Sequence, residues 1–244
     1  TEVYSAAAFC ADALRRMQDI TARGKIPLLV GGTMLYFRAL RFGLSDLPQA
    51  NAEVRAEIEA QAARFGWPYM HKELAKVDEE TAARLKPNDA QRLQRALEIY
   101  HVSGLPMSAL LGKQETYQLP YNLIPLALIP SERKQLHERI TVRFADMLKM
   151  GLLDELEDLK AKYVLKSGMA SMRCVGYRQA WQYLAGEIDK TELLAQGIAA
   201  TRQLAKRQLT WLRGMPDNIE FDCLHPQLNR QILEKVRAKL NETN

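Results

Sequence analysis

The residues with the clearest chemical potential lie toward the C-terminus and are basic. The segment TRQLAKRQLTWLR, residues 201–213, contains four Lys or Arg residues and no acid. On a helix, Arg202, Lys206 and Arg213 fall on one side. Residues 173–213 carry seven basic and three acidic residues, which accounts for +4 of the chain's net charge of +5. Charge concentrated in this way indicates a polyanionic partner, although a solvated helix face is the simpler alternative.

Two shorter segments place arginines at spacings that suit phosphate. In RCVGYR, residues 173–178, two arginines bracket a Val-Gly-Tyr turn, so both guanidiniums could converge on one polyanion. In QRLQR, residues 91–95, Arg92 and Arg95 stand three apart, which makes them neighbours on a helix. A guanidinium binds phosphate with two parallel hydrogen bonds. The alternatives are a surface loop for the first segment and a solvated strip for the second.

A glycine-containing loop, PLLVGGTMLYF at residues 27–37, invites comparison with phosphate-binding loops. It does not fit the GxxxxGK[ST] pattern, because no lysine follows its glycines. A tight turn between a strand and a helix is the simplest interpretation. Loops at the carboxyl ends of parallel strands also form ligand crevices, and Thr33 would lie there beside free backbone N–H groups. Thr33 is therefore a candidate for holding a substrate hydroxyl or phosphate.

The hydrophobic pattern predicts an α/β scaffold for these segments. Residues 10–24 have helical spacing and end at Gly24, and IPLLV at 26–30 is a continuous apolar run typical of a strand buried on both faces. A second helical run follows Thr33, which completes the order expected of a parallel sheet. Later elements are predicted as a strand at 123–130, a helix capped by Ser131 and ended by Gly151, a long helix opened by Asp189 with Glu192, an edge strand at 218–222 and a helix at 226–241.

The middle of the chain differs in character and predicts a helical insertion. Residues 50–104 show three helical stretches: one ending at Gly66, one over residues 70–85, and one opened by Asn88 or Asp89. We therefore predict a core of residues 1–46 and 118–244, with residues 47–117 as an inserted helical domain.

Composition is that of a globular protein, with 47% hydrophobic and 26% charged residues in a chain of 244. No apolar run approaches the ~18 residues of a membrane span, and no signal-peptide pattern opens the chain. Three cysteines without a CxxC spacing indicate reduced thiols and a cytoplasmic protein. Four histidines without an i,i+4 pair argue against a zinc site.

Five motifs together resemble one family: YSAAAF, IPLLVGGTMLYF, PNDAQRLQRALE, MRCVGYRQAWQYL and TRQLAKRQLTWLR. They occur in the order found in bacterial tRNA dimethylallyltransferases, also called tRNA isopentenyltransferases. The resemblance implies a P-loop-kinase-like parallel sheet with a helical insertion that grips the anticodon stem-loop. It also implies dimethylallyl transfer from dimethylallyl diphosphate to N6 of adenosine 37, in tRNAs that read codons beginning with U. Mg²⁺ is the implied cofactor, and a monomer is expected.

The resemblance also implies roles for individual residues. Thr33 and Arg178 match catalytic positions, and Arg178 and Arg202 are our choices for the diphosphate. The implied tRNA contacts are Thr33, Arg55, Gln91, Arg92, Leu93, Gln94, Arg95, Arg173, Cys174, Val175, Gly176, Tyr177, Arg178, Lys206, Arg207, Gln208, Leu209, Thr210, Trp211, Leu212 and Arg213. No metal-ligating residue is assigned.

The sequence departs from the family at its start. Gly24-Lys25 and Gly112-Lys113 are its Gly-Lys pairs, and neither lies in a phosphate-loop pattern. The family's first strand, phosphate loop and general-base aspartate have no match here, and the first residue is Thr1. We therefore expect an N-terminal truncation, an exposed sheet edge and little chemistry by this chain alone.

Three other functions compete with this interpretation. A transferase acting on free adenine nucleotides would need neither the insertion nor the basic helix. A degenerate relative would bind the anticodon stem-loop without modifying it, with a steep salt dependence. A small-molecule kinase is disfavoured by the missing phosphate loop and by the later motifs.

Overall fold

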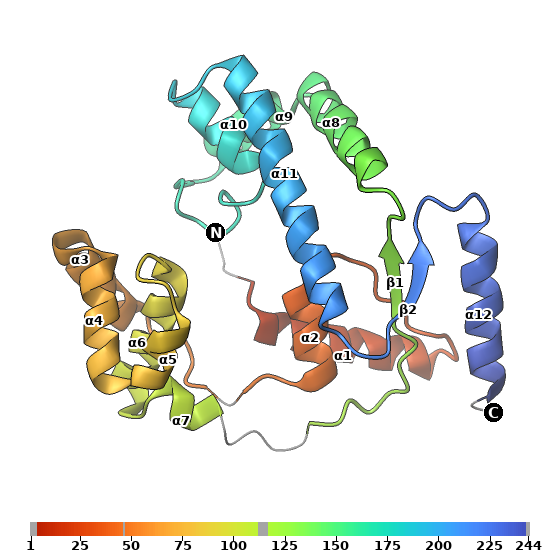
Figure 1. Ribbon diagram of the computed structural model, residues 1–244, viewed down its shortest axis with the longest axis horizontal. Helices are drawn as coiled ribbons and strands as arrows, with labels where there is room; N and C mark the ends of the chain where they lie inside the picture. Colours follow the sequence, from red (N-terminus) through yellow and green to blue (C-terminus); the bar gives the residue numbers. More distant parts are fainter. Residues whose placement is uncertain (1–3, 46, 112–116, 243–244) are drawn as a thin grey trace. The chain divides into compact units, whose positions relative to one another are not determined.

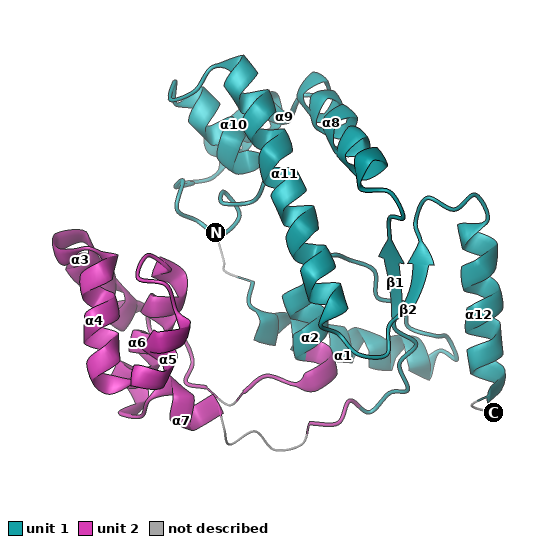
Figure 2. Cartoon of the chain, viewed as in Figure 1, with its two compact units in different colours: residues 1–39, 120–244 teal, residues 40–119 magenta. Residues whose placement is uncertain are grey.

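The computed structural model describes residues 4–45, 47–111 and 117–242 (Figure 1). The Gly112-Lys113 pair and residue 46, the predicted end of the first core segment, lie outside these ranges. The chain divides into two compact units, one of residues 1–39 with 120–244 and one of residues 40–119 (Figure 2). The second unit covers a wider range than the predicted insertion of residues 47–117.

The first unit is mainly helical and contains a small parallel sheet. Strands β1 (Leu126–Ile129) and β2 (Ile219–Asp222) pair in parallel, with Leu126 opposite Ile219. Four helices connect the strands, and further helices precede and follow them. Its helices are α1 (Ala6–Ala22), α8 (Arg133–Lys149), α9 (Leu152–Lys162), α10 (Tyr177–Leu184), α11 (Lys190–Arg213) and α12 (Leu228–Glu242), and α2 (Met34–Phe42) crosses from this unit into the second. Both strands predicted near 123–130 and 218–222 are thus confirmed, within narrower bounds.

Local capping signals explain where α1 ends and where α11 begins. Gly24 follows α1 with φ of 67°, a left-handed conformation that glycine adopts without strain. Asp189 accepts a hydrogen bond from the Glu192 N–H at 2.8 Å, and the Glu192 side chain accepts one from the Asp189 N–H at 2.9 Å. This reciprocal capping box confirms the predicted start of α11.

The predicted strand at residues 26–30 is wrong for the described structure. The segment is not a strand, and Ile26, Leu28 and Val30 are 66, 79 and 87% exposed. A strand buried on both faces needs hydrogen-bonded neighbours and cover on each side. Within the described residues, β1 and β2 pair with each other and not with this segment. The apolar pattern alone therefore does not determine its structure.

Two other local predictions also need correction. Glu132, not Ser131, occupies the cap position of α8, and its side chain makes no capping bond. The Ser131 N–H instead donates to the Asp222 carboxylate at 3.0 Å, which ties the end of β1 to β2. The stretch predicted as one helix over 70–85 is broken at Asp78, whose carboxylate accepts from the Thr81 N–H and so starts a new helix.

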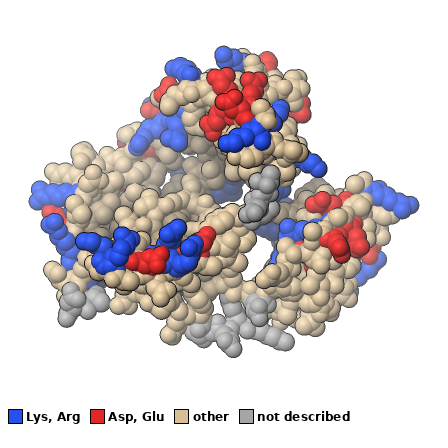
Figure 3. All heavy atoms as spheres, turned by 180° about the vertical axis from the view of Figure 1, so that it is seen from behind, with Lys and Arg blue, Asp and Glu red and all other residues tan. Residues whose placement is uncertain are grey.

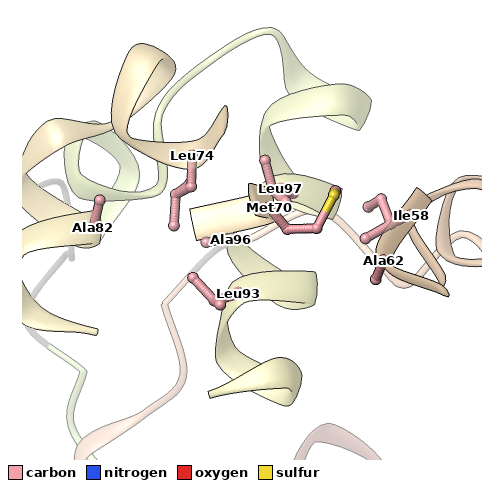
Figure 4. Close-up of a cluster of buried hydrophobic side chains, with 8 residues drawn as sticks. All are labelled: Ile58, Ala62, Met70, Leu74, Ala82, Leu93, Ala96 and Leu97. Atoms are coloured by element: carbon pink, nitrogen blue, oxygen red, sulfur yellow. The ribbon is translucent and has the colours of Figure 1, made fainter. Parts of the chain in front are cut away.

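The second unit is all-helical around one apolar core. Its helices are α3 (Ala52–Phe65), α4 (Trp67–Val77), α5 (Glu79–Arg84), α6 (Ala90–Ser103) and α7 (Met107–Leu111). The core side chains come from α3 to α6 and are Ile58, Ala62, Met70, Leu74, Ala82, Leu93, Ala96 and Leu97 (Figure 4). Asp89 caps α6 and Gly104 ends it in a left-handed conformation, which confirms the predicted limits of that helix.

In the first unit, α8 and α11 pack unusually closely at one glycine. A Cβ atom added at Gly197 would overlap the ring of Phe144, which is itself buried. Glycine is therefore required at this position by close approach, not by backbone conformation. The contact fixes the spacing of the two helices that carry part of the candidate site.

Among the described residues, no helix is long and apolar enough to cross a membrane.

Candidate active site and RNA interface

A long-range hydrogen bond joins the glycine loop to the basic helix. The Gln208 side-chain amide on α11 donates to the Gly32 carbonyl at 2.8 Å, across 176 positions of sequence. The approach is close, because a Cβ atom on Gly32 would overlap Nε2 of Gln208. Thr33 directly follows this peptide, and the Tyr36 N–H of α2 donates to the Thr33 carbonyl at 2.9 Å. The structure therefore brings Thr33 together with one of the predicted RNA-contact segments.

Arg202 lies at a hollow between α11 and α8. The hollow has a volume of about 590 Å³ and is lined by Lys134, His137, Glu138, Thr141, Val142 and Arg202. The Arg202 guanidinium donates to the Thr141 hydroxyl at 3.1 Å. Farther along α11, Lys206, Arg207 and Arg213 have exposed side chains. These positions allow Arg202, Lys206, Arg207 and Arg213 to meet an anion from solvent.

Residues 173–178 span the turn before α10 and the first two residues of that helix, and hydrogen bonds to neighbouring side chains hold the segment in place. Gly176 has φ of 99°, and its N–H donates to the Gln179 side chain at 3.0 Å. Arg173, Cys174 and Arg178 are exposed, whereas Val175 is half-buried and Gly176 is buried. The Tyr177 hydroxyl donates to the Glu155 carboxylate on α9. Arg173 and Arg178 are thus exposed to solvent, whereas the Tyr177 hydroxyl is already hydrogen-bonded to Glu155.

The Tyr177–Glu155 pair supports one prediction. The hydrogen bond to Glu155, with burial as a second cause, raises the pKa of Tyr177 to about 12. Replacing Glu155 with glutamine removes the anion that stabilises the protonated phenol, so the pKa of Tyr177 falls toward the ordinary value of about 10. Ultraviolet titration compares Glu155→Gln with wild type. The curve of the matching Tyr177→Phe variant is subtracted from each, so that the difference reports Tyr177 alone. An unchanged titration curve would contradict the assigned cause.

In the helical unit, two predicted RNA-contact arginines bind a buried carboxylate. Glu98 is completely buried and accepts from Arg55 at 2.8 and 3.2 Å and from Arg95 at 2.8 Å. The Asn51 N–H adds a bond of 2.8 Å. Burial raises the pKa of Glu98, but the bonds from Arg55, Arg95 and Asn51 outweigh burial and leave the pKa below its ordinary value. Arg95 also donates to the Pro48 carbonyl at 2.7 Å.

The Glu98 site explains what sequence analysis missed. The family resemblance implied RNA contacts for Arg55 and Arg95, yet part of each guanidinium fork is bound within the protein. The sequence does carry a signal, since Glu98 stands three residues after Arg95 on a predicted helix. Nothing in that spacing reveals that Arg55, 43 positions away, completes the cluster.

The remaining positions of the QRLQR segment face different surroundings. Leu93 is completely buried in the core, and Gln94 donates to Glu59 at 2.8 Å. Arg92 is exposed and donates to Asp89, its helix cap, at 3.1 Å. A hollow of about 460 Å³ adjoins this face, and its lining residues are Thr81, Leu85, Asp89, Gln91, Arg92, Arg95 and Met107. Gln91, Arg92 and Arg95 are therefore the members of this segment placed to meet a ligand.

On the face seen in Figure 3, Lys and Arg side chains lie beside Asp and Glu side chains, so the charge there is mixed. Within the described ranges, no three His, Cys, Asp or Glu side chains gather in a group that could hold a metal ion.

Solved structures show which class of protein has this architecture. The tRNA isopentenylpyrophosphate transferase of Bacillus halodurans matches with a TM-score of 0.64 and 33% identity, covering 99% of this chain and 75% of that one. The corresponding Staphylococcus epidermidis enzyme matches with a TM-score of 0.63 and 25% identity, covering 100% and 78%. A eukaryotic dimethylallyltransferase shares the fold, with a TM-score of 0.72 at 23% identity. The fold is that of tRNA isopentenylpyrophosphate transferases.

Sequence comparison places the chain in one family. The family model described as IPP transferase matches residues 1–215. A tRNA dimethylallyltransferase of Methylobacillus flagellatus is 60% identical over 241 residues, which is 98% of this chain and 76% of that protein. One from Azoarcus sp. is 58% identical over 235 residues, 95% of this chain and 73% of that protein. The chain belongs to the IPP transferase family, and the resemblance noted from the motifs is confirmed.

Proposed function

We propose that this protein is a tRNA dimethylallyltransferase. It transfers a dimethylallyl group from dimethylallyl diphosphate to N6 of adenosine 37 in tRNAs that read codons beginning with U. The observation that carries the proposal is the 60% identity to a tRNA dimethylallyltransferase across nearly the whole chain. The contact between the Gly32 loop and α11 supports it, because it brings the loop that carries Thr33 together with the basic helix in one unit. A tRNA substrate places the enzyme in the cytoplasm.

The reaction requires the target base to leave its stack, since N6 of a stacked anticodon-loop adenine is not free to react. In our proposal the adenine enters beside Thr33, and N6 attacks the allylic C1 carbon. The N6–C1 bond forms as the C1–O bond breaks, diphosphate departs with the electron pair of the C1–O bond, and N6 passes a proton to solvent water. Arg178 and Arg202 stabilise the charge that develops on the departing diphosphate.

The exposed basic and polar side chains supply the RNA contacts in this proposal. In the helical unit these are Gln91 and Arg92, with the free part of Arg55 and Arg95. In the first unit they are the outward residues of the 173–178 loop and of α11. Single-stranded RNA is held by such groups through its backbone and by aromatic side chains through its bases, a role open to the partly exposed Trp211.

Among the described residues, no group of three or more His, Cys, Asp or Glu side chains could hold a metal ion. We propose instead that Mg²⁺ arrives bound to the diphosphate, since this ion commonly keeps waters and substrate phosphates as ligands. The P-loop-kinase-like character of the core and the monomeric state are likewise part of the proposal. They follow from the family resemblance.

The direct test is incubation of the chain with an A36-A37-A38 anticodon stem-loop, dimethylallyl diphosphate and Mg²⁺. Digestion and mass spectrometry then measure N6-dimethylallyladenosine, with the Methylobacillus flagellatus relative as the positive control. Product on this RNA, and none on a stem-loop with guanosine at position 37, is the supporting result, and it would also overturn the expectation of little chemistry by a chain without the phosphate-loop motif. Product on free AMP would favour the adenine-nucleotide alternative. RNA binding without product would favour the non-catalytic alternative, and neither binding nor product would overturn the proposal.

A further inference from the structure

The hollow between α8 and α11 contains a threonine whose hydrogen bonds have a fixed direction. The Thr141 hydroxyl donates its proton to the His137 carbonyl, one turn earlier on α8, at 2.9 Å. A hydroxyl has one proton to donate, so Thr141 faces Arg202 as an acceptor. A guanidinium has donors and no acceptor. In the 3.1 Å hydrogen bond, Arg202 is therefore always the donor and Thr141 the acceptor. The bond holds the Arg202 side chain against α8.

The surroundings of this pair suit an anion. Lys134 and His137 stand on the same side of α8 as Thr141, at the i, i+3 and i+7 positions of a helix face. Lys134 and Arg202 bring two cations to the hollow against one carboxylate, that of Glu138. With about 590 Å³ of space, the hollow has room for a small phosphorylated ligand.

Position along α11 relates this hollow to the glycine loop. Gln208, which holds the Gly32 carbonyl, lies six residues after Arg202 on the same helix. Six residues of an α-helix span about 9 Å. Arg202, proposed to bind the diphosphate, and Gln208, which holds the loop proposed to bind the adenine, are thus separated along one rigid helix. Such a separation is expected for two substrates that react with each other.

We propose that Thr141 is a positioning residue for diphosphate binding. By accepting one hydrogen bond from Arg202, it fixes the guanidinium at the hollow so that the remaining N–H groups of Arg202, with Lys134, bind the diphosphate of the allylic substrate. This inference rests on the proposed function, and it adds residues of α8 to the diphosphate site.

The test is isothermal titration of the chain with inorganic diphosphate and Mg²⁺, using two replacements of Thr141. Thr141→Val keeps the shape and removes the acceptor, so the Kd for diphosphate rises about fivefold. Thr141→Ser keeps the hydroxyl and restores affinity to within about twofold. Arg202→Ala raises Kd about tenfold, and adding Thr141→Val to it has no further effect because the two residues act as one unit.

Thr201 provides a matched control for the valine replacement. Its hydroxyl makes the same bond to the carbonyl four residues earlier, that of Gly197 at 2.7 Å, and it takes no part in the proposed site. Thr201→Val should leave Kd unchanged. In the transfer assay, Thr141→Val should raise KM for dimethylallyl diphosphate more than it lowers kcat.

Several outcomes would overturn the inference. One is an unchanged Kd for Thr141→Val beside a raised Kd for Arg202→Ala, which would leave Arg202 without a positioning partner. Another is no diphosphate binding by the wild-type chain. A third is weaker binding of the anticodon stem-loop, and not of diphosphate, which would assign the hollow to an RNA phosphate. Failure of the proposed function is distinct, since it is measured by the absence of modified adenosine.

Discussion

Replacing Glu98 with alanine destabilises the helical unit by about 3 kcal/mol. Removing one partner of a buried ion pair typically costs about 3–5 kcal/mol, because the other charge is left without compensation. The lower end applies here, since the Arg55 and Arg95 side chains are 40 and 31% exposed and water can reach them after the change. Urea unfolding followed by circular dichroism measures the free energy of unfolding. The Asn51 backbone also loses its acceptor, so the N-terminal end of α3 should fray first.

A surface pair in the same unit supplies the control. Glu80 is largely exposed and lies 3.7 Å from Arg84, so Glu80→Ala should change the free energy of unfolding by no more than about 0.5 kcal/mol. An effect of Glu98→Ala as small as that of the control would show that the buried cluster contributes nothing to stability.

The same cluster predicts a dependence of stability on pH. The folded-state pKa of Glu98 is lowered, so its contribution is fully present above the pKa of the unfolded chain, about 4.3, and is lost as pH falls through the folded value. Glu98→Gln, which cannot ionise, should therefore unfold with a shallower pH dependence below about pH 4. A parallel acid-unfolding curve for the two proteins would contradict the assignment.

The helix ends could be predicted from the sequence because they depend on local interactions. The Asp189–Glu192 capping box, the Asp89 cap and the glycines that end α1 and α6 act within a few residues, and each marked its helix correctly. The prediction of a buried strand at residues 26–30 was wrong because the burial of a strand depends on which segments pair with it. A continuous apolar run indicates side chains that favour burial, but it does not identify the segment that would bury them.

The candidate site was predictable as residue types but not as contacts. The basic segment of α11 and the Gly32–Thr33 loop were both recognisable, whereas the hydrogen bond from Gln208 to Gly32 joins positions 176 apart. The same limit applies to Arg55 and Glu98. An arginine that binds RNA and one that binds a buried carboxylate are identical in sequence, and only the folded surroundings distinguish them.

Replacing Gly197 with alanine should destabilise the first unit by about 2 kcal/mol, although alanine is the better helix former. Helix propensity favours alanine over glycine by about 1 kcal/mol in a helix interior. Against this, the new methyl group overlaps several atoms of the Phe144 ring, which is buried and must move as a whole. Overpacking of that kind costs about 1–3 kcal/mol, and the upper end applies because the obstacle is a rigid ring. The clash therefore outweighs the gain, as thermal and urea unfolding would measure.

Two further variants separate the clash from helix propensity. Ala195 is exposed on the same helix, so Ala195→Gly reports propensity alone and should cost about 1 kcal/mol. Combining Gly197→Ala with Phe144→Leu removes ring atoms from the overlap and should recover part of the loss, giving a non-additive pair. If Gly197→Ala were stabilising, the close approach of α8 and α11 would be wrong, and with it the spacing that places Arg202 against Thr141. The stability of this one contact thus bears directly on the diphosphate site.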